Sequence, residues 1–233
     1  MNPHPTKRNQ RECSCVYCGS TTQITREHVF PKNLFPPPRP RNLITVPACE
    51  SCNKSYDQDD EYFRAFVVTA GVEDPTGRKM WDEKVFGPTL RRSPKLKKTL
   101  VDSLRKVEYK SPGGIYLGER REIRFGRSRV NRIIEKSVRG LYMHHLGRAL
   151  RSQSTFRIIF NPKLKNLEAV VADCGPPIRI GDGNVVQCRF AYVPESPEQS
   201  LWWLMFYGTT HVIVLVNAEE PEGSPRKEIT QRR

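Results

Sequence analysis

Residues 15–53 read CVYCGSTTQITREHVFPKNLFPPPRPRNLITVPACESCN, and this stretch decides the fold of the first part of the chain. Its two C-x-x-C pairs, Cys15/Cys18 and Cys49/Cys52, bracket 30 residues (49 − 18 − 1). Two such pairs are typical of one tetrahedral zinc site, because cysteine thiolates bind zinc at about 2.3 Å in a closed four-coordinate shell. We therefore predict a structural zinc ion that is bound by all four cysteines and has no open position for chemistry.

Between the two pairs, the sequence predicts short extended segments at about residues 21–29 and 43–46. Prolines at six positions from Pro31 to Pro47 predict a stiff loop, because proline fixes φ and lacks an N–H donor. From Ser51 the apolar residues recur at helical spacing, and Gly71 is predicted to end that helix. A unit this small has few large apolar side chains, so we expect the zinc to act as its staple.

The same stretch carries Glu27, His28, Asn42 and Asn53. A histidine has a reference pKa near 6.5, so it can be neutral and accept a proton from water at cellular pH. Carboxylate and amide oxygens are ligands for hard divalent cations. Phosphodiester hydrolysis needs an activated water and positive charge beside the phosphate oxygens. These residues therefore indicate a site that cuts a phosphodiester.

The combination resembles the HNH endonuclease family, whose catalytic unit is the ββα-metal or His-Me finger. The resemblance covers Cys15-x-x-Cys18, then Glu27-His28-Val29-Phe30-Pro31, then the run from Asn42-Leu43 to Cys52-Asn53, which is under a fifth of the chain. Each piece is weak by itself, and the combination is specific.

This resemblance implies that His28 is the general base and that Asn42 braces the loop and orients that base. It also implies that Glu27 and Asn53 hold a catalytic divalent cation. Glu27 stands where the family commonly has Asp, and Asn53 stands where it usually has His. Both ligands are then oxygens, which favour Mg²⁺ or Mn²⁺. The expected activity is that of a metal-dependent HNH endonuclease acting on DNA.

Positive charge is concentrated in the middle of the chain. The net charge is +14, and residues 91–139 carry 16 Lys/Arg against 5 Asp/Glu. Such an excess predicts a polyanionic partner, most simply nucleic acid, and the HNH resemblance makes double-stranded DNA the expected one. Phosphate contacts carry no sequence information, so RNA stays open as an alternative.

The remaining pattern predicts an α+β protein, in which the zinc-stabilised ββα finger precedes a basic α/β region with a mostly antiparallel C-terminal sheet. The expected helices lie at about residues 79–86, 95–106 and 128–150, and the expected strands within 107–125 and at 156–160, 167–172, 187–193, 201–207 and 211–216. We expect three parts: a nuclease domain with a basic N-terminal arm (1–75), an accessory nucleic-acid-binding domain (76–217) after a linker at 73–77, and a disordered tail (218–233).

Charged residues outside the zinc segment are expected at the surface. The polar face of the helix at 128–150 is predicted to carry Arg129, Arg132, Lys136 and Arg139. Asp59 and Asp60 are predicted on the solvent face of the preceding helix, where acids suit the N-terminal dipole.

The sequence has no apolar run of about 18 residues and no signal-peptide pattern at its start, so we expect no membrane span and a cytoplasmic location. Two alternatives to the DNA endonuclease stay open. One is a non-catalytic zinc-containing protein that binds nucleic acid. The other is an RNA-cleaving or toxin-like nuclease gated by a protein or small-molecule partner of the C-terminal domain. The sequence does not specify an oligomeric state.

Overall fold

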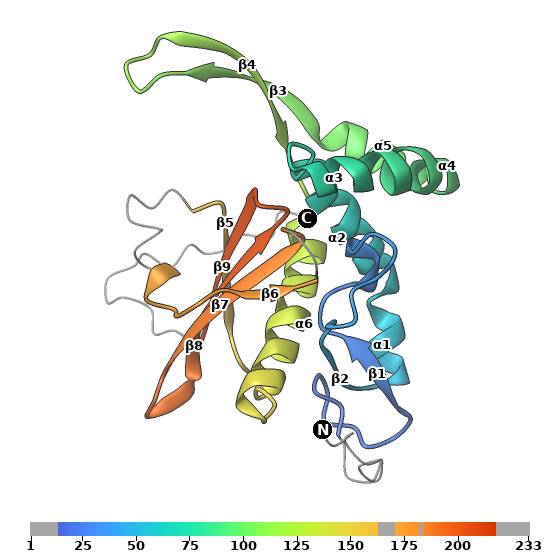
Figure 1. Ribbon diagram of the computed structural model, residues 1–233, viewed down its shortest axis with the longest axis vertical. Helices are drawn as coiled ribbons and strands as arrows, with labels where there is room; N and C mark the ends of the chain where they lie inside the picture. Colours follow the sequence, from blue (N-terminus) through green and yellow to red (C-terminus); the bar gives the residue numbers. More distant parts are fainter. Residues whose placement is uncertain (1–13, 163–170, 182–183, 218–233) are drawn as a thin grey trace, which may run out of the picture.

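The computed structural model describes residues 14–162, 171–181 and 184–217. Figure 1 shows a small N-terminal unit and an antiparallel sheet on either side of a long central helix, α6 (Arg127–Leu146), with a two-stranded hairpin extending beyond them. Helices and strands both contribute to one body, which confirms the α+β class.

The N-terminal unit begins with a two-stranded antiparallel sheet. Strands β1 (Ile24–His28) and β2 (Thr45–Cys49) pair from Ile24↔Cys49 to His28↔Thr45. The proline-rich loop between them contains one short 3-10 helix, η1 (Lys32–Leu34). The chain then enters α1 (Glu50–Ser55) and, after Tyr56, α2 (Asp57–Ala70), which ends at Gly71. The first predicted extended segment and the helix stop are confirmed, whereas the second strand begins at Thr45, two residues later than the predicted start at 43.

Residues 73–77, predicted to be a linker, instead contain the start of a helix. Asp74 caps α3 (Pro75–Met80) by accepting hydrogen bonds from the N–H groups of Thr76 and Gly77. An aspartate followed by proline at the first helical position is a helix-start signal, because proline has no N–H to leave unpaired. The helical path continues through the π-helix η2 (Trp81–Thr89), α4 (Leu90–Arg92) and α5 (Pro94–Ser103).

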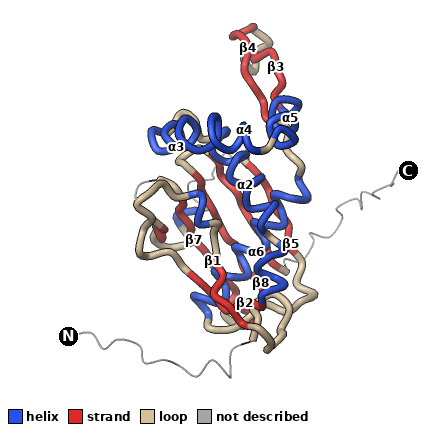
Figure 2. Tube along the Cα trace, turned by 90° about the vertical axis from the view of Figure 1, so that its right-hand side faces the viewer, coloured by secondary structure: helices blue, strands red, loops and turns tan. Residues whose placement is uncertain are grey.

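Strands β3 (Leu104–Lys110) and β4 (Tyr116–Ile123) form the predicted hairpin. Within the described residues they pair only with each other. Figures 1 and 2 show that the hairpin projects away from the rest of the molecule. We call residues 104–123 the arm.

Helix α6 packs against the segment that follows β1. Val29 touches the helix at Gly140, where a Cβ would come within 2.7 Å of the valine Cγ2. The Ser137 hydroxyl lies 2.9 Å from the Val29 carbonyl oxygen. A glycine and a small polar residue on this face of α6 therefore let the helix lie directly on the chain beyond His28.

The C-terminal sheet is antiparallel throughout, which confirms the prediction. Its strand order is β5-β9-β8-β7-β6. The strands are β5 (Phe156–Phe160), β6 (Ile178–Ile180), β7 (Val186–Val193), β8 (Ser196–Phe206) and β9 (Thr210–Val216). The short strand β6 escaped prediction. Of the strand expected at 167–172, residues 171–172 are helical and the rest lies outside the described residues, as do residues 1–12 and the tail 218–233.

One hydrophobic core runs from the N-terminal unit to the last strand. Phe206 of β8 contacts the rings of Phe30 and Phe63 edge-on, and the buried Tyr207 hydroxyl donates to the Leu34 carbonyl at 2.6 Å. The division into two domains near residue 75 stays a prediction, and the apolar contacts cross that position. The N-terminal unit thus gains a core that zinc alone would not supply.

Within the described residues, none of the helices combines the length and apolar character needed to cross a lipid bilayer.

We predict that Tyr207→Phe lowers the free energy of unfolding by about 1–3 kcal/mol, because the Leu34 carbonyl would be left buried without its donor. Urea unfolding measures the change. The control is Tyr116→Phe on the arm, where the side chain is 57% exposed and the expected change is below about 0.5 kcal/mol. Equal losses in both variants would contradict the proposed bond between sheet and N-terminal loop.

Candidate functional site

Cys15, Cys18, Cys49 and Cys52 form a cluster in which the four sulfur atoms lie within 4.8 Å of one another. The Sγ atoms of Cys18 and Cys49 are 3.6 Å apart. Zinc–sulfur bonds of 2.3 Å in a tetrahedron place sulfurs about 3.8 Å apart, so the cluster matches a zinc site. The structure thus brings together all four cysteines that the sequence predicts, in an arrangement that can bind a metal such as zinc.

Local backbone bonds hold both halves of this cluster. Cys15 donates its N–H to the Ser20 carbonyl at 2.7 Å and accepts from the Gly19 N–H at 2.8 Å, which closes a tight turn around Cys18. Gly19 has φ +76°, a conformation that favours glycine. On the other side, the Cys49 sulfur caps α1 by accepting from the Cys52 N–H at 3.4 Å.

The hydrogen bond from the Cys52 N–H, together with the neighbouring thiols, lowers the pKa of Cys49 to about 7. Burial and the neighbouring thiols raise the pKa of Cys52. The two thiols therefore differ in how readily they lose a proton. Zinc binds the thiolate form, so Cys49 is prepared as a ligand and the metal must displace the proton of Cys52.

The cysteine cluster and His28 lie at opposite ends of the β1–β2 sheet. Cys49 is paired with Ile24 at one end, and His28 is paired with Thr45 at the other. Four strand residues separate the two ends by about 13 Å. A metal in the cluster therefore shapes the sheet and the start of α1, and takes no direct part in chemistry at His28.

His28 is half-buried, and no hydrogen bond joins its ring to another of the described residues. Burial lowers the pKa of His28; the Glu27 charge opposes this, and the cations Lys32, Lys136 and Arg39 reinforce it. The neutral ring, which can accept a proton, is thus favoured at neutral pH.

The surface around His28 is positively charged. In a strand, side chains two residues apart share a face, so Arg26 lies on the same face of β1 as His28. Arg26, Lys32 and Arg39 are all exposed, and Arg26 Nη2 donates to the Thr45 hydroxyl at 3.1 Å. We call this face, with His28 and the three exposed cations, the His28 face.

Glu27 lies on the opposite face of β1 and is only 7% exposed. Its carboxylate forms an ion pair with Lys136 of α6, and the Lys136 ammonium also contacts Asp60 of α2 at 3.2 Å. The Lys136 side chain is fully buried. Burial raises the pKa of Asp60 to about 6, although Lys136 lowers it. We call Glu27, Asp60 and Lys136 the buried triad.

Asn53 and Asn42 each hold a backbone segment. Asn53 of α1 donates from Nδ2 to the Thr25 hydroxyl of β1 at 3.0 Å, so its amide oxygen is left free of described partners. The Asn42 side-chain oxygen accepts from the Gly181 N–H at 3.2 Å, just beyond β6. Asn42 therefore ties the loop before β2 to the C-terminal sheet.

These positions bear on the predicted Mg²⁺ or Mn²⁺ site. Asn53 bonds to Thr25, which shares its face of β1 with Glu27, and the two predicted oxygen ligands therefore belong to the same side of the sheet. Glu27, however, is neutralised by a buried ammonium. A divalent cation at Glu27 would stand beside Lys136, and like charges at such a distance repel strongly inside a protein. The side chains as arranged do not fit a catalytic cation at Glu27 and Asn53.

Lys136, Asp59 and Asp60 are less exposed than predicted, whereas Arg129 and Arg132 keep their predicted surface positions, with side chains 40% and 45% exposed. Asp59 accepts from Arg129 Nε at 2.6 Å and from Arg132 Nη1 at 2.8 Å, and Asp60 contacts Lys136. These acids and cations are 70 or more residues apart in sequence, so helical periodicity could not pair them. Gly140 lies four residues after Lys136, and a glycine inside a helix signals close approach of another segment. That was the available clue that this face of α6 is covered.

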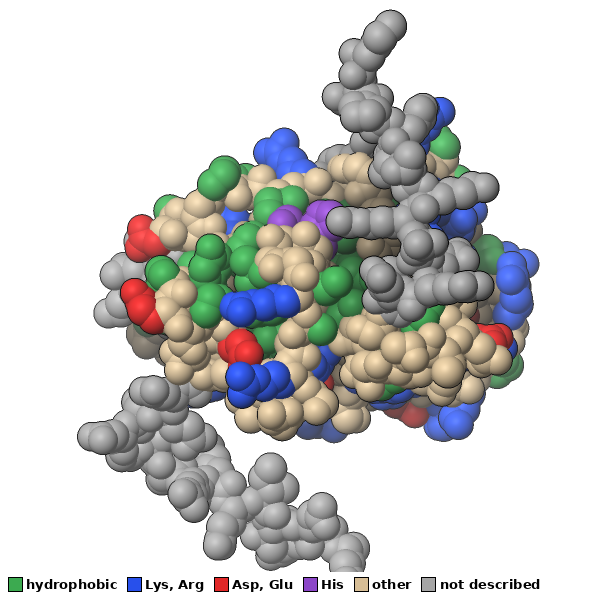
Figure 3. Space-filling view, turned by 90° about the horizontal axis from the view of Figure 1, so that it is seen from below, with side chains coloured by type: hydrophobic (Ala, Val, Ile, Leu, Met, Phe, Trp, Pro, Cys, Tyr) green, Lys and Arg blue, Asp and Glu red, His purple; other side chains and the backbone are tan. Residues whose placement is uncertain are grey.

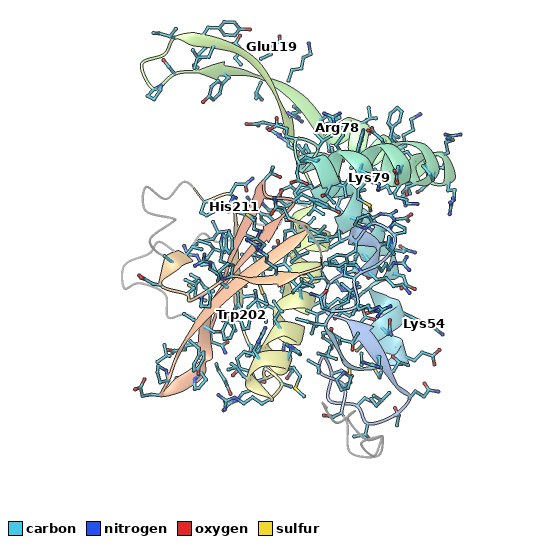
Figure 4. The ribbon with its side chains drawn as sticks, viewed as in Figure 1. Lys54, Arg78, Lys79, Glu119, Trp202 and His211 are labelled. Atoms are coloured by element: carbon cyan, nitrogen blue, oxygen red, sulfur yellow. The ribbon has the colours of Figure 1, made fainter. Side chains whose placement is uncertain are left out.

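A large hollow lies away from His28. It has a volume of about 950 Å³ and is located where the arm joins the body. Phe66, Trp81, Phe125 and Phe160 supply aromatic walls, and Arg78 and Glu73 supply charge. Figure 4 labels Arg78 near the base of the arm. No histidine is among the described residues that line this hollow, so it is a separate place from the His28 face.

His144 and His145 are not part of the His28 face. They end α6, and the His145 ring packs against Phe190 and Trp202. Figure 3 shows histidine side chains surrounded by hydrophobic ones at one end of the molecule. His144 is exposed, whereas burial and the neighbouring His144 lower the pKa of His145.

Comparisons with protein-family models, with curated proteins and with solved structures find no match for this chain. The resemblance to HNH endonucleases therefore depends on the residues quoted for it. What the structure adds is their placement on β1, β2 and α1.

We predict that the purified protein contains one zinc ion per chain and that Cys49→Ser removes it and destabilises the N-terminal unit, because structural zinc sites contribute folding energy directly. Elemental analysis and thermal unfolding measure both effects. The control is Cys188→Ala, whose thiol is buried in β7 outside the cluster and whose zinc content should stay at one. Full zinc content in Cys49→Ser would contradict the four-cysteine site.

We predict that Glu27→Gln lowers the free energy of unfolding by about 3 kcal/mol at pH 7, because it removes one partner of a buried ion pair. The matched control is Glu50→Gln, which removes the partner of Lys54 in an exposed pair on α1 and should cost much less. Figure 4 shows Lys54 at the outer side of the molecule. Urea unfolding measures the free energy of unfolding of both variants. Equal decreases in the two would contradict the burial of the triad.

Proposed function

We propose that this chain hydrolyses phosphodiester bonds in DNA as an HNH-like endonuclease, with His28 as the general base. The observation that supports it is the order and placement of the parts. An antiparallel β1–β2 pair leads into α1, four cysteines gather at one end, and His28 stands at the other end with a lowered pKa.

The His28 face offers the two requirements of the reaction. The neutral imidazole takes a proton from the attacking water, since its pKa lies below the ordinary value. Arg26, Lys32 and Arg39 place positive charge on the same side, where the phosphate oxygens become more negative as the bond breaks. Asn42 holds the loop between these cations and β2 by its bond to Gly181.

No divalent cation takes part in the proposed reaction, because Glu27 is already paired with the ammonium of Lys136. The expected Mg²⁺ or Mn²⁺ is tested directly by adding either ion to zinc-loaded protein. Cleavage that requires the added ion would mean that Lys136 releases Glu27 when substrate binds. Cleavage without it would mean that the exposed cations of the His28 face supply the charge. Robust cleavage with added Zn²⁺ alone would count against oxygen ligands.

We predict that His28→Ala reduces the rate of plasmid nicking by about 10²–10⁴-fold, because a general base is lost. The control is His144→Ala, an exposed histidine at the end of α6, which should nick like the wild type. Conversion of supercoiled plasmid to the open circle measures both. Equal nicking by the wild type and His28→Ala would remove His28 from the mechanism.

The pH profile supplies a second readout on the same residue. A base with a lowered pKa stays neutral to more acid pH, so the acid limb of kcat/KM should lie below pH 6.5. An acid limb above pH 6.5 would contradict the environment described for His28.

One observation favours a second candidate function, a non-catalytic zinc-containing nucleic-acid-binding protein. Glu27 is committed to Lys136 and lies on the opposite face of β1 from His28, so two residues expected to share a catalytic site are separated. DNA binding without any nicking, in the presence of Mg²⁺ or Mn²⁺, would establish this candidate in place of the endonuclease.

A further inference from the structure

Near its end, the arm exposes apolar side chains that lie away from the described part of the body. Ile115, Tyr116 and Leu117 near its end are 68%, 57% and 56% exposed. A two-stranded ribbon is marginally stable by itself in water, and exposed apolar groups add to its cost. Figure 4 shows side chains, Glu119 among them, standing out from the arm without contact with the body. These residues are placed for a partner.

Cations surround the base and the stem of the arm. The four basic residues on α6 are used within the fold: Arg129 and Arg132 bind Asp59, Lys136 belongs to the buried triad, and Arg139 donates to the Arg151 and Ser152 carbonyls. Other cations are exposed and form no ion pair in the described part of the chain: Arg91, Arg92, Lys95, Lys97, Arg105, Arg124 and Arg127. Within residues 91–139, the described positive charge that is free of ion pairs therefore lies on α4, α5, the arm and the segment beyond it.

From this combination we propose that the arm is a DNA-binding ribbon, whose apolar end (Ile115 to Leu117) enters a groove of duplex DNA while cations of α5 and the stem bind the flanking phosphates. The choice of DNA rests on the proposed function, and the charge and shape of the arm support it independently.

The dimensions of the arm fit a groove. The eight residues of β4 span about 26 Å. The major groove of B-DNA is about 12 Å wide and about 8.5 Å deep and admits a two-stranded ribbon. Laid lengthwise in the groove, an arm of about 26 Å covers about eight base-pair steps of roughly 3.4 Å, so its end contacts base edges while Lys97 and Arg105, in α5 and at the start of β3, reach phosphates farther along the duplex.

The edges of the arm argue against pairing with a second copy of the chain. Ion pairs join Lys106 to Glu119 at 3.0 Å and Lys110 to Glu108 at 2.9 Å. A register shift at Tyr109/Lys110 bends the ribbon. Charged side chains and bulges at strand edges disfavour edge-to-edge association. Binding of a DNA backbone needs no strand pairing, so these charged edges do not oppose it.

The test measures DNA binding by full-length His28→Ala protein, so that cleavage does not interfere. The probe is a fluorescent duplex of roughly 30 base pairs, titrated at several salt concentrations. We expect Ile115→Ser/Tyr116→Ser to weaken duplex binding at least tenfold. The matched control is Tyr192→Ser/Val193→Ser, another exposed aromatic and aliphatic pair, located at the β7–β8 turn, which should bind like the parent.

The phosphate contacts have their own variants. Lys97→Ala/Arg105→Ala should reduce the slope of log K against log salt by about two, one unit for each lost phosphate contact. Lys54→Ala on α1 is the control and should leave the slope unchanged. Thermal melting and zinc content confirm that each variant folds, which is expected because the substituted arm residues are exposed.

Three outcomes would overturn the proposal: equal duplex binding by the Ile115/Tyr116 variant and its control, an equal loss on single-stranded DNA, or tighter, tip-dependent binding to anionic phospholipid vesicles. The first outcome would show that the end of the arm does not contact DNA. The second would show that the arm does not depend on the groove of a duplex. The third would show that the end of the arm binds a membrane surface. Because binding is measured without cleavage, a failure here leaves the His28 nicking result unaffected, and loss of nicking activity leaves this result unaffected.

Discussion

The fold depends on one buried ammonium, that of Lys136. It joins three elements that are far apart in sequence: β1 through Glu27, α2 through Asp60, and α6, which carries the lysine itself. Burying a lysine without a partner would be costly, and a single carboxylate would leave part of its hydrogen-bonding capacity unused. Two acids satisfy it, and burial raises the pKa of Asp60 to about 6 although Lys136 lowers it. Gly140 and Ser137 then bring α6 against Val29, directly beyond His28.

The four cysteines act at the other end of the same strand pair. They fix where β2 turns into α1, because Cys49 is both a predicted zinc ligand and the cap of that helix. The triad fixes how the opposite side of β1 faces α2 and α6. His28 is thereby held between two anchors, neither of which contacts its ring. The two anchors position the backbone at His28, while the half-buried ring remains open to a ligand.

Local signals predicted much of this fold, and contacts between distant segments account for what was missed. The cysteine spacing, the turn residues and the two-residue and helical periodicities located the metal cluster, β1, the arm, α6 and four of the five strands of the C-terminal sheet. The misplacement of Lys136 and Asp60 has another cause: polarity predicts solvent exposure for each alone, and only their meeting across 76 residues makes burial favourable. Asp74-Pro75 is a local helix-start signal, so the prediction of a linker at residues 73–77 was wrong for a reason visible in the sequence itself.

The position of Glu27 also changes how mutations of the Glu27-His28 pair should be interpreted. A variant at Glu27 that loses activity would ordinarily support metal ligation by that carboxylate. Here the same carboxylate stabilises the packing of β1 against α6, so loss of activity also follows from loss of structure. His28 has no such role, since its ring makes no hydrogen bond within the described chain. A His28 variant can therefore lose activity while it keeps its stability, whereas a Glu27 variant is expected to lose both. Only the histidine variant tests the chemistry by itself.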